Sequence, residues 1–189
     1  MRTLKLQVQT SIDGFIGGPN GELDWLTWNW DDALKNYVAA LTEPIDCIVM
    51  GRNMAPGFIA HWTKAAENPG TPEYDFARKM TDTPKVVFTK TLAQSEWPNT
   101  VLAKGALADE IARIKQAPGS DIIAYGGAQF VGSLVAAGLI DELNLFVNPV
   151  ILGNGLPIFS SVEQRQQLTL AEARAFEGGI VLLKYLKAG

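Results

Sequence analysis

Apolar residues alternate with polar ones near the N-terminus and recur further along the chain in short, separated blocks. Leu4, Leu6 and Val8 stand at every second position, which predicts a strand with one buried face over residues 3–10. The block IDCIVM, residues 45–50, is apolar without alternation and predicts a strand that is buried on both faces. Further strands are predicted at residues 85–90, 99–104, 121–125, 142–151, 168–176 and 179–186, the last two as a hairpin.

Helical spacing and helix-start residues separate these blocks. An apolar stripe over residues 34–41 predicts a helix that Asp31 or Asn29 caps and that ends near residue 42. Thr71-Pro72-Glu73 predicts another helix start, with a hydroxyl cap, a proline at the first position and an early acid. Further helices are predicted after Gly51-Arg52, over residues 106–116 and over residues 128–137.

Strands that alternate with helices predict an α/β fold, because right-handed crossovers connect parallel neighbours. We expect one domain over residues 1–189, with a mostly parallel central sheet, an antiparallel C-terminal hairpin and helices on both faces. Ligands of such sheets bind at the carboxyl ends of the strands. The segments that follow the predicted strands are therefore the first places to look for a site.

Composition excludes several classes of protein. The chain is 47% hydrophobic and 19% charged, no apolar run could span a membrane, and no signal peptide is recognisable, so we expect a cytoplasmic protein. A net charge of −4 argues against a nucleic-acid binder. The chain has a single cysteine and a single histidine, so we expect no disulfide and no metal site.

Three predicted strand ends carry residues that suit an anionic ligand. Gly126-Gly127 precedes a helix, whose first N–H groups can bind a phosphate. Gly51-Arg52 adds a guanidinium at a second helix start, and Thr89-Lys90 adds a hydroxyl and an ammonium group. Each feature alone also has an ordinary explanation, as a packing turn or as a solvated surface charge. Their value lies in their occurrence at the same edge of one sheet.

The motifs SIDGFIGGPNGELDW (residues 11–25), MGR (50–52), VVFTK (86–90) and the long segment that begins YGGAQF (125–159) occur in one order. In this order the chain resembles the dihydrofolate-reductase-like superfamily, and specifically the stand-alone bacterial proteins related to the reductase domain of riboflavin biosynthesis. The resemblance extends from Leu4 to Leu186. It implies a three-layer dihydrofolate-reductase-like fold and an NADPH-dependent oxidoreductase.

The resemblance also implies where NADPH would bind. The pyrophosphate would lie on the turn after residue 125, the 2′-phosphate beside the Arg-containing and Lys-containing strand ends, and the nicotinamide against the first strand and its loop. The implied cofactor residues are Val8, Gln9, Ile16, Gly17, Gly51, Arg52, Thr89, Lys90, Gly126, Gly127, Ala128 and Gln129. Met54 replaces the hydroxyl residue that the family often has at this position, so one phosphate contact is missing.

The resemblance also implies which residues lie on the substrate side of the site, namely a tryptophan and two adjacent aspartates that follow it. Trp28-Asn29 followed by Asp31-Asp32 is similar to the dihydrofolate reductase pattern, in which an acid early in a helix binds and helps protonate the substrate. We expect Asp32 to be this acid, Asp31 to be the helix cap and Trp28 to contact substrate, although first-turn acids also occur for the helix dipole alone. Asp13 is the competing acid, with a turn cap as its structural alternative.

An acid in an apolar, tryptophan-lined pocket would have a raised pKa, which suits proton donation. Trp25, Trp28 and Trp30 could form that wall, the core or a dimer interface.

We therefore predict an NADPH-dependent reductase of a small heterocyclic or carbonyl-bearing substrate. The alternative is a nucleotide-binding or drug-binding protein that does not turn over. The apolar final strands predict a homodimer.

Overall fold

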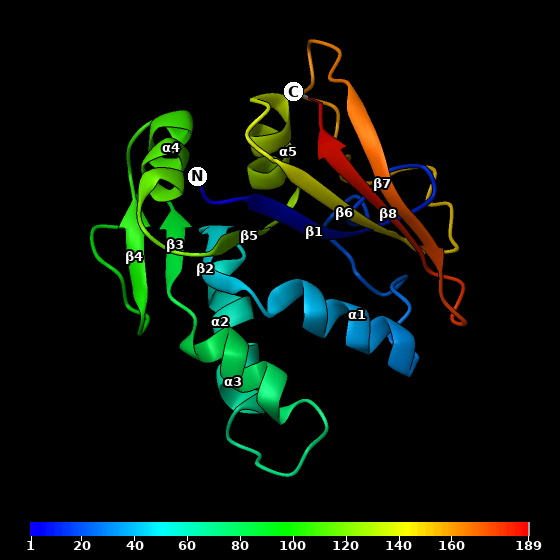
Figure 1. Cartoon of the computed structure of the whole chain (residues 1–189), viewed down its shortest axis with the longest axis horizontal. Helices are drawn as coiled ribbons and strands as arrows, with labels where there is room; N and C mark the ends of the chain where they lie inside the picture. Colours follow the sequence, from blue (N-terminus) through cyan, green and yellow to red (C-terminus); the bar gives the residue numbers. More distant parts are fainter. Residues whose placement is uncertain (189) are drawn as a thin grey trace.

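The computed structural model describes residues 1–188, whose eight strands form one sheet in the order β4-β3-β2-β5-β1-β6-β8-β7 (Figure 1). Neighbours from β4 through β6 pair in parallel, whereas β8 is antiparallel to β6 and to β7. The mostly parallel sheet with an antiparallel C-terminal hairpin is thus confirmed. The strands are β1 (Leu4–Thr10), β2 (Ile45–Gly51), β3 (Lys85–Phe88), β4 (Thr100–Ala103), β5 (Asp121–Tyr125), β6 (Glu142–Val147), β7 (Leu168–Ala175) and β8 (Val181–Lys187).

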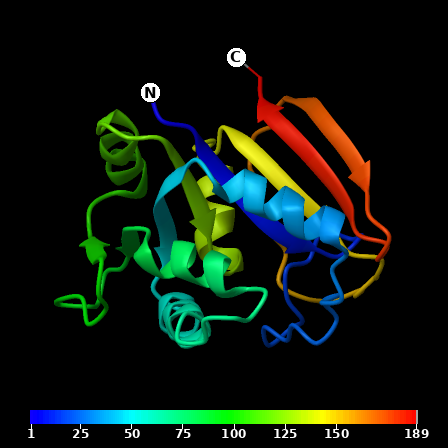
Figure 2. The same cartoon turned by 60° about the horizontal axis from the view of Figure 1, so that its bottom comes forward.

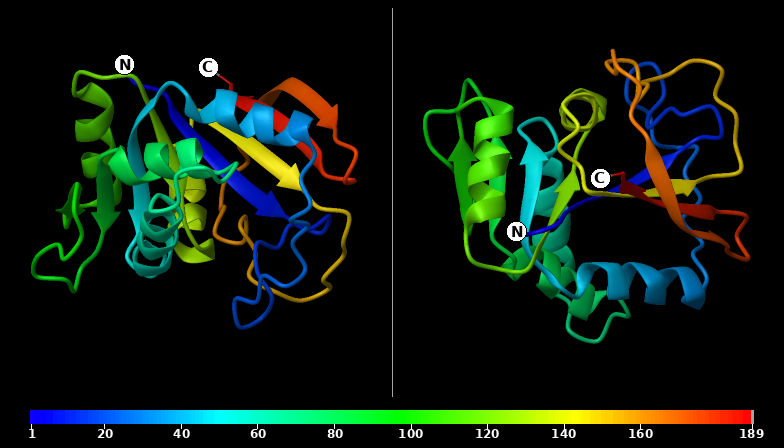
Figure 3. Two further views of the ribbon diagram at one scale, coloured as in Figure 1. Left: turned by 90° about the horizontal axis from the view of Figure 1, so that it is seen from below. Right: turned by 45° about the horizontal axis from the view of Figure 1, so that its top comes forward.

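Helices cover both faces of the sheet and complete the three layers (Figures 2 and 3). The first three helices lie on one face and the last two on the other, which is clearest in the right-hand view of Figure 3. The α/β class and the arrangement of layers therefore agree with the sequence-based prediction. The helices are α1 (Asp32–Thr42), α2 (Ala55–Ala65), α3 (Tyr74–Asp82), α4 (Leu107–Gln116) and α5 (Ala128–Ala136).

Strand β2 shows why the sheet is buried on both sides. Cys47 and Val49 point into the cluster that α4 and α5 cover, whereas Ile48 and Met50 point into the cluster that α2 and α3 cover. Successive side chains of a strand alternate between faces, so an unbroken apolar block is what two covered faces require. The strand buried on both faces that the continuous block at residues 45–50 predicts is thus confirmed.

Strand β1 is also central, but its two faces differ in polarity. Leu4, Leu6 and Val8 are buried in the cluster under α4 and α5. The alternating positions Lys5, Gln7 and Gln9 point to the opposite face, toward the side of α1, α2 and α3. These three side chains therefore make part of the space between the sheet and helices α1, α2 and α3 polar.

Helix boundaries agree with the sequence in one case and differ in another. Asp31 is the N-cap of α1, as predicted. Helix α3, in contrast, begins at Tyr74 with Glu73 as an N-cap that makes no side-chain bond, so the predicted start at residue 71 is wrong. The Thr71 hydroxyl donates instead to the carbonyl of Asn68 and closes the preceding turn. Among residues 1–188, no helix combines the length and the apolarity that a membrane span needs.

Candidate active site

Three of the predicted segments come together at the carboxyl edge of the sheet. Strands β3, β2 and β5 are parallel neighbours, and their registers place Gly51 beside Phe88 and Met50 beside Tyr125. The turns that follow these strands therefore open at one edge. The structure thus brings the Gly51, Thr89 and Gly126 turns close together, as the sequence predicted.

The glycines at this edge have different structural reasons. A Cβ atom on Gly51 would lie 2.9 Å from the Cβ of Phe130, and one on Gly126 would lie 2.8 Å from its Cδ1. Both glycines therefore make room for the Phe130 side chain, which also packs on Phe88 with ring centroids 5.1 Å apart. At these two positions glycine is explained by packing within the protein.

Gly127 has no such explanation. No atom lies within 4 Å of a Cβ placed there, and its φ of −73° is one that any residue adopts. Gly127 is the N-cap of α5 and provides no side chain to cap it. Among residues 1–188, the backbone N–H groups of Ala128 and Gln129 have no acceptor. The open space over an uncapped helix start fits a ligand phosphate.

The second cation that was expected at this edge points elsewhere. The Nζ of Lys90 donates to the carbonyls of Lys104 and Gly105, at 2.7 Å each, and so holds the end of β4. The Thr89 hydroxyl is also engaged, because it accepts the N–H groups of Thr91 and Leu92. In this structure Lys90 is therefore not placed to bind the same phosphate as Arg52, although the resemblance implied this.

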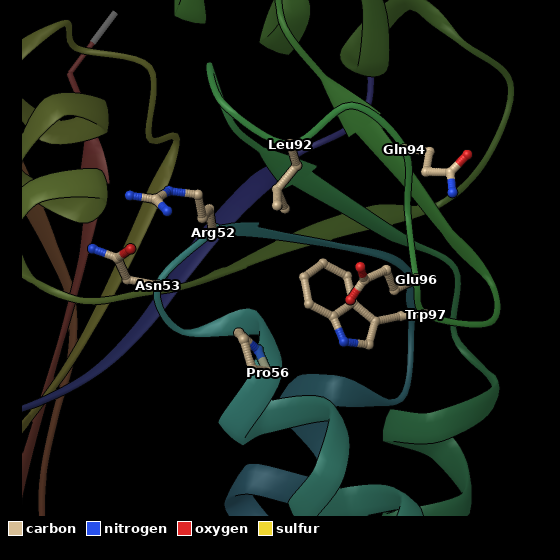
Figure 4. A pocket seen from close by; sticks show the side chains of 7 residues that line it. All are labelled: Arg52, Asn53, Pro56, Leu92, Gln94, Glu96 and Trp97. Carbon is tan, nitrogen blue, oxygen red and sulfur yellow. The ribbon is translucent and has the colours of Figure 1, made fainter.

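Arg52 borders a cavity of about 480 Å³ between the start of α2 and the segment that connects β3 to β4 (Figure 4). Its guanidinium is exposed and makes no hydrogen bond or ion pair with any residue that the structure describes. An unengaged guanidinium at a cavity rim is available to an anionic ligand. The cavity is lined by Arg52, Asn53, Pro56, Leu92, Gln94, Glu96 and Trp97.

The predicted nicotinamide contacts on β1 and its loop are divided between two surfaces. Val8 is buried on the face of α4 and α5, away from Gln9, so these neighbours cannot both contact one ring through side chains. The N–H of Ile16 donates to the carbonyl of Leu156, and the carbonyl of Gly17 accepts the N–H of the same residue. These two backbone groups are thus already paired, and Gln9 is half-buried with its Oε1 bonded to Asn148.

A polar row crosses the middle of the sheet on the face of α1, α2 and α3. The Tyr125 hydroxyl donates to Oε1 of Gln7 at 2.8 Å, and Nδ2 of Asn148 donates to Oε1 of Gln9 at 2.8 Å. Asn144 lies opposite Gln7, and its buried Oδ1 accepts no hydrogen bond from the described residues. Burial raises the pKa of the Tyr125 phenol, so this hydroxyl stays protonated and can act as a donor.

Sequence reasoning did not name Gln7 and Tyr125 among the candidate site residues. The available signal was the alternation in β1, where Lys5, Gln7 and Gln9 give a polar face to a strand that the rest of the sheet surrounds. The ring of Tyr125 packs on Phe58 of α2, with centroids 5.3 Å apart. The phenol is therefore held between the sheet and α2, next to the glycine turn.

The predicted acids are placed differently from the expected apolar pocket. The Asp32 side chain is 94% exposed, and its carboxylate lies 3.6 Å from Nζ of Lys35. Asp31 accepts the N–H groups of Leu34 and Glu177, at 2.7 Å each, and these bonds, led by that of Leu34, lower the pKa of its carboxyl group. Neither Asp31 nor Asp32 therefore lies in the desolvated pocket where the sequence predicted a proton donor.

Asp13 also has a structural role. Its two carboxylate oxygens accept the N–H groups of Leu152 and Gly153, at 3.1 and 2.7 Å. The side chain of Ser11, and then these N–H groups, lower the pKa of the Asp13 carboxyl group. The carboxylate therefore joins the loop after β1 to the segment after β6.

The tryptophan cluster does not form a closed wall. Trp28 is 67% exposed and stacks on Trp30, with ring centroids 6.3 Å apart. The indole N–H groups of Trp25 and Trp30 donate to backbone carbonyls within the same loop. Trp30 also packs against the apolar cluster under α1. The substrate contact predicted for Trp28 would therefore have to form at an open surface.

Comparisons with known proteins agree with this architecture. The model of the RibD C-terminal domain matches residues 2–182. The protein YyaP of Bacillus subtilis is 32% identical over 185 residues, which are 97% of this chain and 94% of that protein. A candidate riboflavin biosynthesis protein of Shewanella has a crystal structure that covers 100% of both chains, with a TM-score of 0.73 and 23% identity.

The fold is also that of a dihydrofolate reductase. The enzyme from Enterococcus faecalis, solved in complex with NADP(H), superimposes with a TM-score of 0.59 and 14% identity, over 99% of this chain and 97% of that one. The three-layer dihydrofolate-reductase-like fold that the sequence resemblance implied is therefore confirmed.

Proposed function

Because the chain belongs to the RibD C-terminal domain family, we propose that it is an NADPH-dependent reductase of a small substrate. The substrate class is a pterin-like or pyrimidine-like heterocycle, or a carbonyl compound of similar size. The family and the shared fold with a dihydrofolate reductase support a reductase of this general kind. We also propose that residues 1–189 form one domain and that the protein is cytoplasmic.

The observation that carries this proposal is the open space over Gly127. A glycine with an ordinary φ and no neighbour within 4 Å leaves a place that the protein itself does not use. The adjacent N–H groups at the start of α5 supply hydrogen-bond donors and a positive dipole end. Both properties suit the pyrophosphate of a dinucleotide, with Arg52 as the cation for the 2′-phosphate.

When bound, a reduced nicotinamide supplies the hydride. Gln9 lies on the face and near the strand end where the ring is expected, and Gln7 with Tyr125 is next to it on the same surface. We infer that the Tyr125 phenol, whose single proton is donated to Oε1 of Gln7 in this structure, turns that proton to the substrate oxygen or nitrogen that gains negative character when substrate is bound. A neutral phenol stabilises developing charge without itself being ionised.

The assembly proposed from the sequence also has structural support. Strand β7 is an edge strand with seven of its eight residues exposed, including Leu168 and Leu170. An exposed edge with apolar side chains favours pairing with another chain, so we propose a homodimer. Light scattering at micromolar concentration should give twice the 20.5 kDa chain mass.

One observation favours the alternative, a nucleotide-binding or drug-binding protein without turnover. Asp32 is exposed and Asp13 is fully engaged with backbone N–H groups, so neither acid is free beside the polar row. If catalysis requires a carboxylic acid at the substrate, this chain lacks one in the expected position. Binding of the dinucleotide would then persist while hydride transfer would not.

Cofactor titration and turnover assays separate the two functions. Addition of NADPH should quench tryptophan fluorescence, and oxidation of NADPH should follow when a reducible pterin or pyrimidine is added. Quenching without oxidation, across a panel of both substrate classes, would favour the binding protein. Absence of NADPH binding, measured by calorimetry, would contradict the reductase and also a binding protein for this dinucleotide.

A further inference from the structure

The cavity beside the start of α2 carries two opposite charges. Arg52 is the one cation and Glu96 the one anion among its lining residues. In Figure 4, Glu96 lies with Trp97 on one side of the cavity, and Arg52 lies with Asn53 on the other. Among residues 1–188, no ion pair within 4 Å joins these two charges. Each charge is therefore available to a molecule that enters between them.

The local charge is less positive than a 2′-phosphate site requires. A phosphate monoester carries between one and two negative charges near neutral pH, and cations normally compensate it. Lys90, the second cation expected here, is bonded to the carbonyls of Lys104 and Gly105 and does not line the cavity. Glu96 cancels the charge of Arg52, so the lining has no net positive charge.

The remaining walls suit a nucleoside. Trp97, Leu92 and Pro56 present apolar surface, and a flat base can stack on an indole ring. A base that stacks on Trp97 would bring its ribose close to Glu96, which lies beside Trp97 in the cavity wall (Figure 4). A carboxylate in this position accepts hydrogen bonds from ribose hydroxyl groups, which is how dinucleotide sites recognise an unphosphorylated 2′-hydroxyl.

We propose that Glu96 sets the cofactor selectivity of this site. Its carboxylate accepts the ribose hydroxyls of NADH and repels the 2′-phosphate of NADPH, which Arg52 attracts. This inference rests on the proposed function, because it takes the cavity to hold the adenosine half of a nicotinamide dinucleotide. It predicts that the wild-type chain prefers NADPH only weakly and also accepts NADH.

The test replaces Glu96 by Gln, which removes the charge and keeps the shape. Calorimetric titration with NADPH and NADH, and with the fragments adenosine 2′,5′-bisphosphate and adenosine 5′-monophosphate, measures the selectivity without any substrate. Glu96→Gln should bind NADPH about three- to tenfold more tightly than the wild type, as expected for an exposed charge facing a phosphate, with NADH unchanged or weaker. Glu163→Gln, an exposed acid after β6, is the matched control and should change neither affinity.

The outcomes separate this inference from the proposed function. If Glu96→Gln leaves the ratio of the two affinities as in the wild type, the inference is overturned and the proposed function stands. If the wild type binds neither dinucleotide nor either fragment, both are overturned. A gain in NADPH affinity that appears equally in Glu163→Gln would reflect overall charge alone and would also overturn it.

Discussion

The two sides of the candidate active site differ in whether their polar groups are already bonded. On the cofactor side, the Arg52 guanidinium and the first N–H groups of α5 have no partner among the described residues. On the expected substrate side, both oxygens of Asp31 and both oxygens of Asp13 accept backbone N–H groups. Unbonded groups at a strand edge are available to a ligand, whereas fully bonded carboxylates hold loops together. Residue type alone does not distinguish these cases.

The largest expected effect comes from two adjacent glycines on the cofactor side. Gly126→Ala places a Cβ 2.8 Å from the Phe130 ring, and such overpacking costs about 1–3 kcal/mol in the free energy of unfolding. Gly127→Ala meets no neighbouring atom, so it should cost only the poorer N-cap, about 0.5–1 kcal/mol. Its methyl group would occupy the proposed pyrophosphate space, and NADPH affinity should fall at least about tenfold. Urea unfolding and calorimetric titration measure the two quantities.

A double substitution tests the reason for the first effect. Phe130→Ala removes the ring atom that a Cβ on Gly126 would approach, so adding Gly126→Ala to this variant should cost less than in the wild type. If Gly127→Ala binds NADPH as tightly as the wild type, the pyrophosphate does not lie there. The comparison between the two sides would then lose its main support.

The next effect concerns the cations of the cofactor side. Arg52→Ala should weaken NADPH binding about tenfold or more and leave NADH nearly unchanged, because a charge-assisted hydrogen bond to the 2′-phosphate is lost. Lys90→Ala is the matched control, since its Nζ is bonded to Lys104 and Gly105. This variant should keep the ratio of the two cofactor affinities. Equal weakening of both cofactors by Arg52→Ala would place this residue at the pyrophosphate or in the fold.

Much of the fold was predictable from the sequence because its determinants are local. The unbroken apolar block at residues 45–50 and the glycine turn after residue 125 are encoded within a few positions. The places of Asp13 and Lys90 were not predictable, because their partners are distant in the sequence: Gly153 lies in the segment after β6 and Lys104 follows the end of β4. Hydrogen-bond saturation is a property of the tertiary structure. For this reason the sequence indicated Arg52 and the first N–H groups of α5 as groups for a ligand, but it did not show that the side chains of Lys90 and Asp13 are already bonded within the protein.

The third prediction concerns the bonded side. Asp31→Asn keeps one oxygen for the helix cap but loses the second acceptor, which binds the N–H of Glu177, whereas Asp31→Ala loses both. The midpoint of thermal unfolding should therefore fall in the order wild type, Asn variant, Ala variant. Equal midpoints for all three would show that the carboxylate is not structural.

The pH dependence of this effect has a definite sign. The pKa of Asp31 is lowered from its ordinary 3.8, mainly by the hydrogen bond from Leu34, so the carboxylate form is favoured by folding. Its contribution to stability is fully present above pH 3.8 and is lost as the pH falls through the lower pKa of the folded state. The difference between wild type and Asp31→Asn should therefore shrink with acidification, as measured by unfolding at several pH values.

The smallest expected effect is that of Asp32→Asn. The side chain is 94% exposed and its ion pair with Lys35 spans 3.6 Å, so the free energy of unfolding should change by less than about 0.5 kcal/mol.

If Tyr125 supplies the substrate-side donor, turnover by Asp32→Asn should equal that of the wild type, whereas Tyr125→Phe should lose most of it at unchanged cofactor affinity. Tyr37→Phe, which removes a hydroxyl bonded to Glu172 at the hairpin, is the control for loss of a phenol. A large loss of turnover in Asp32→Asn would instead mean that α1 moves its first turn toward the substrate, and that the acid predicted from the sequence acts after all.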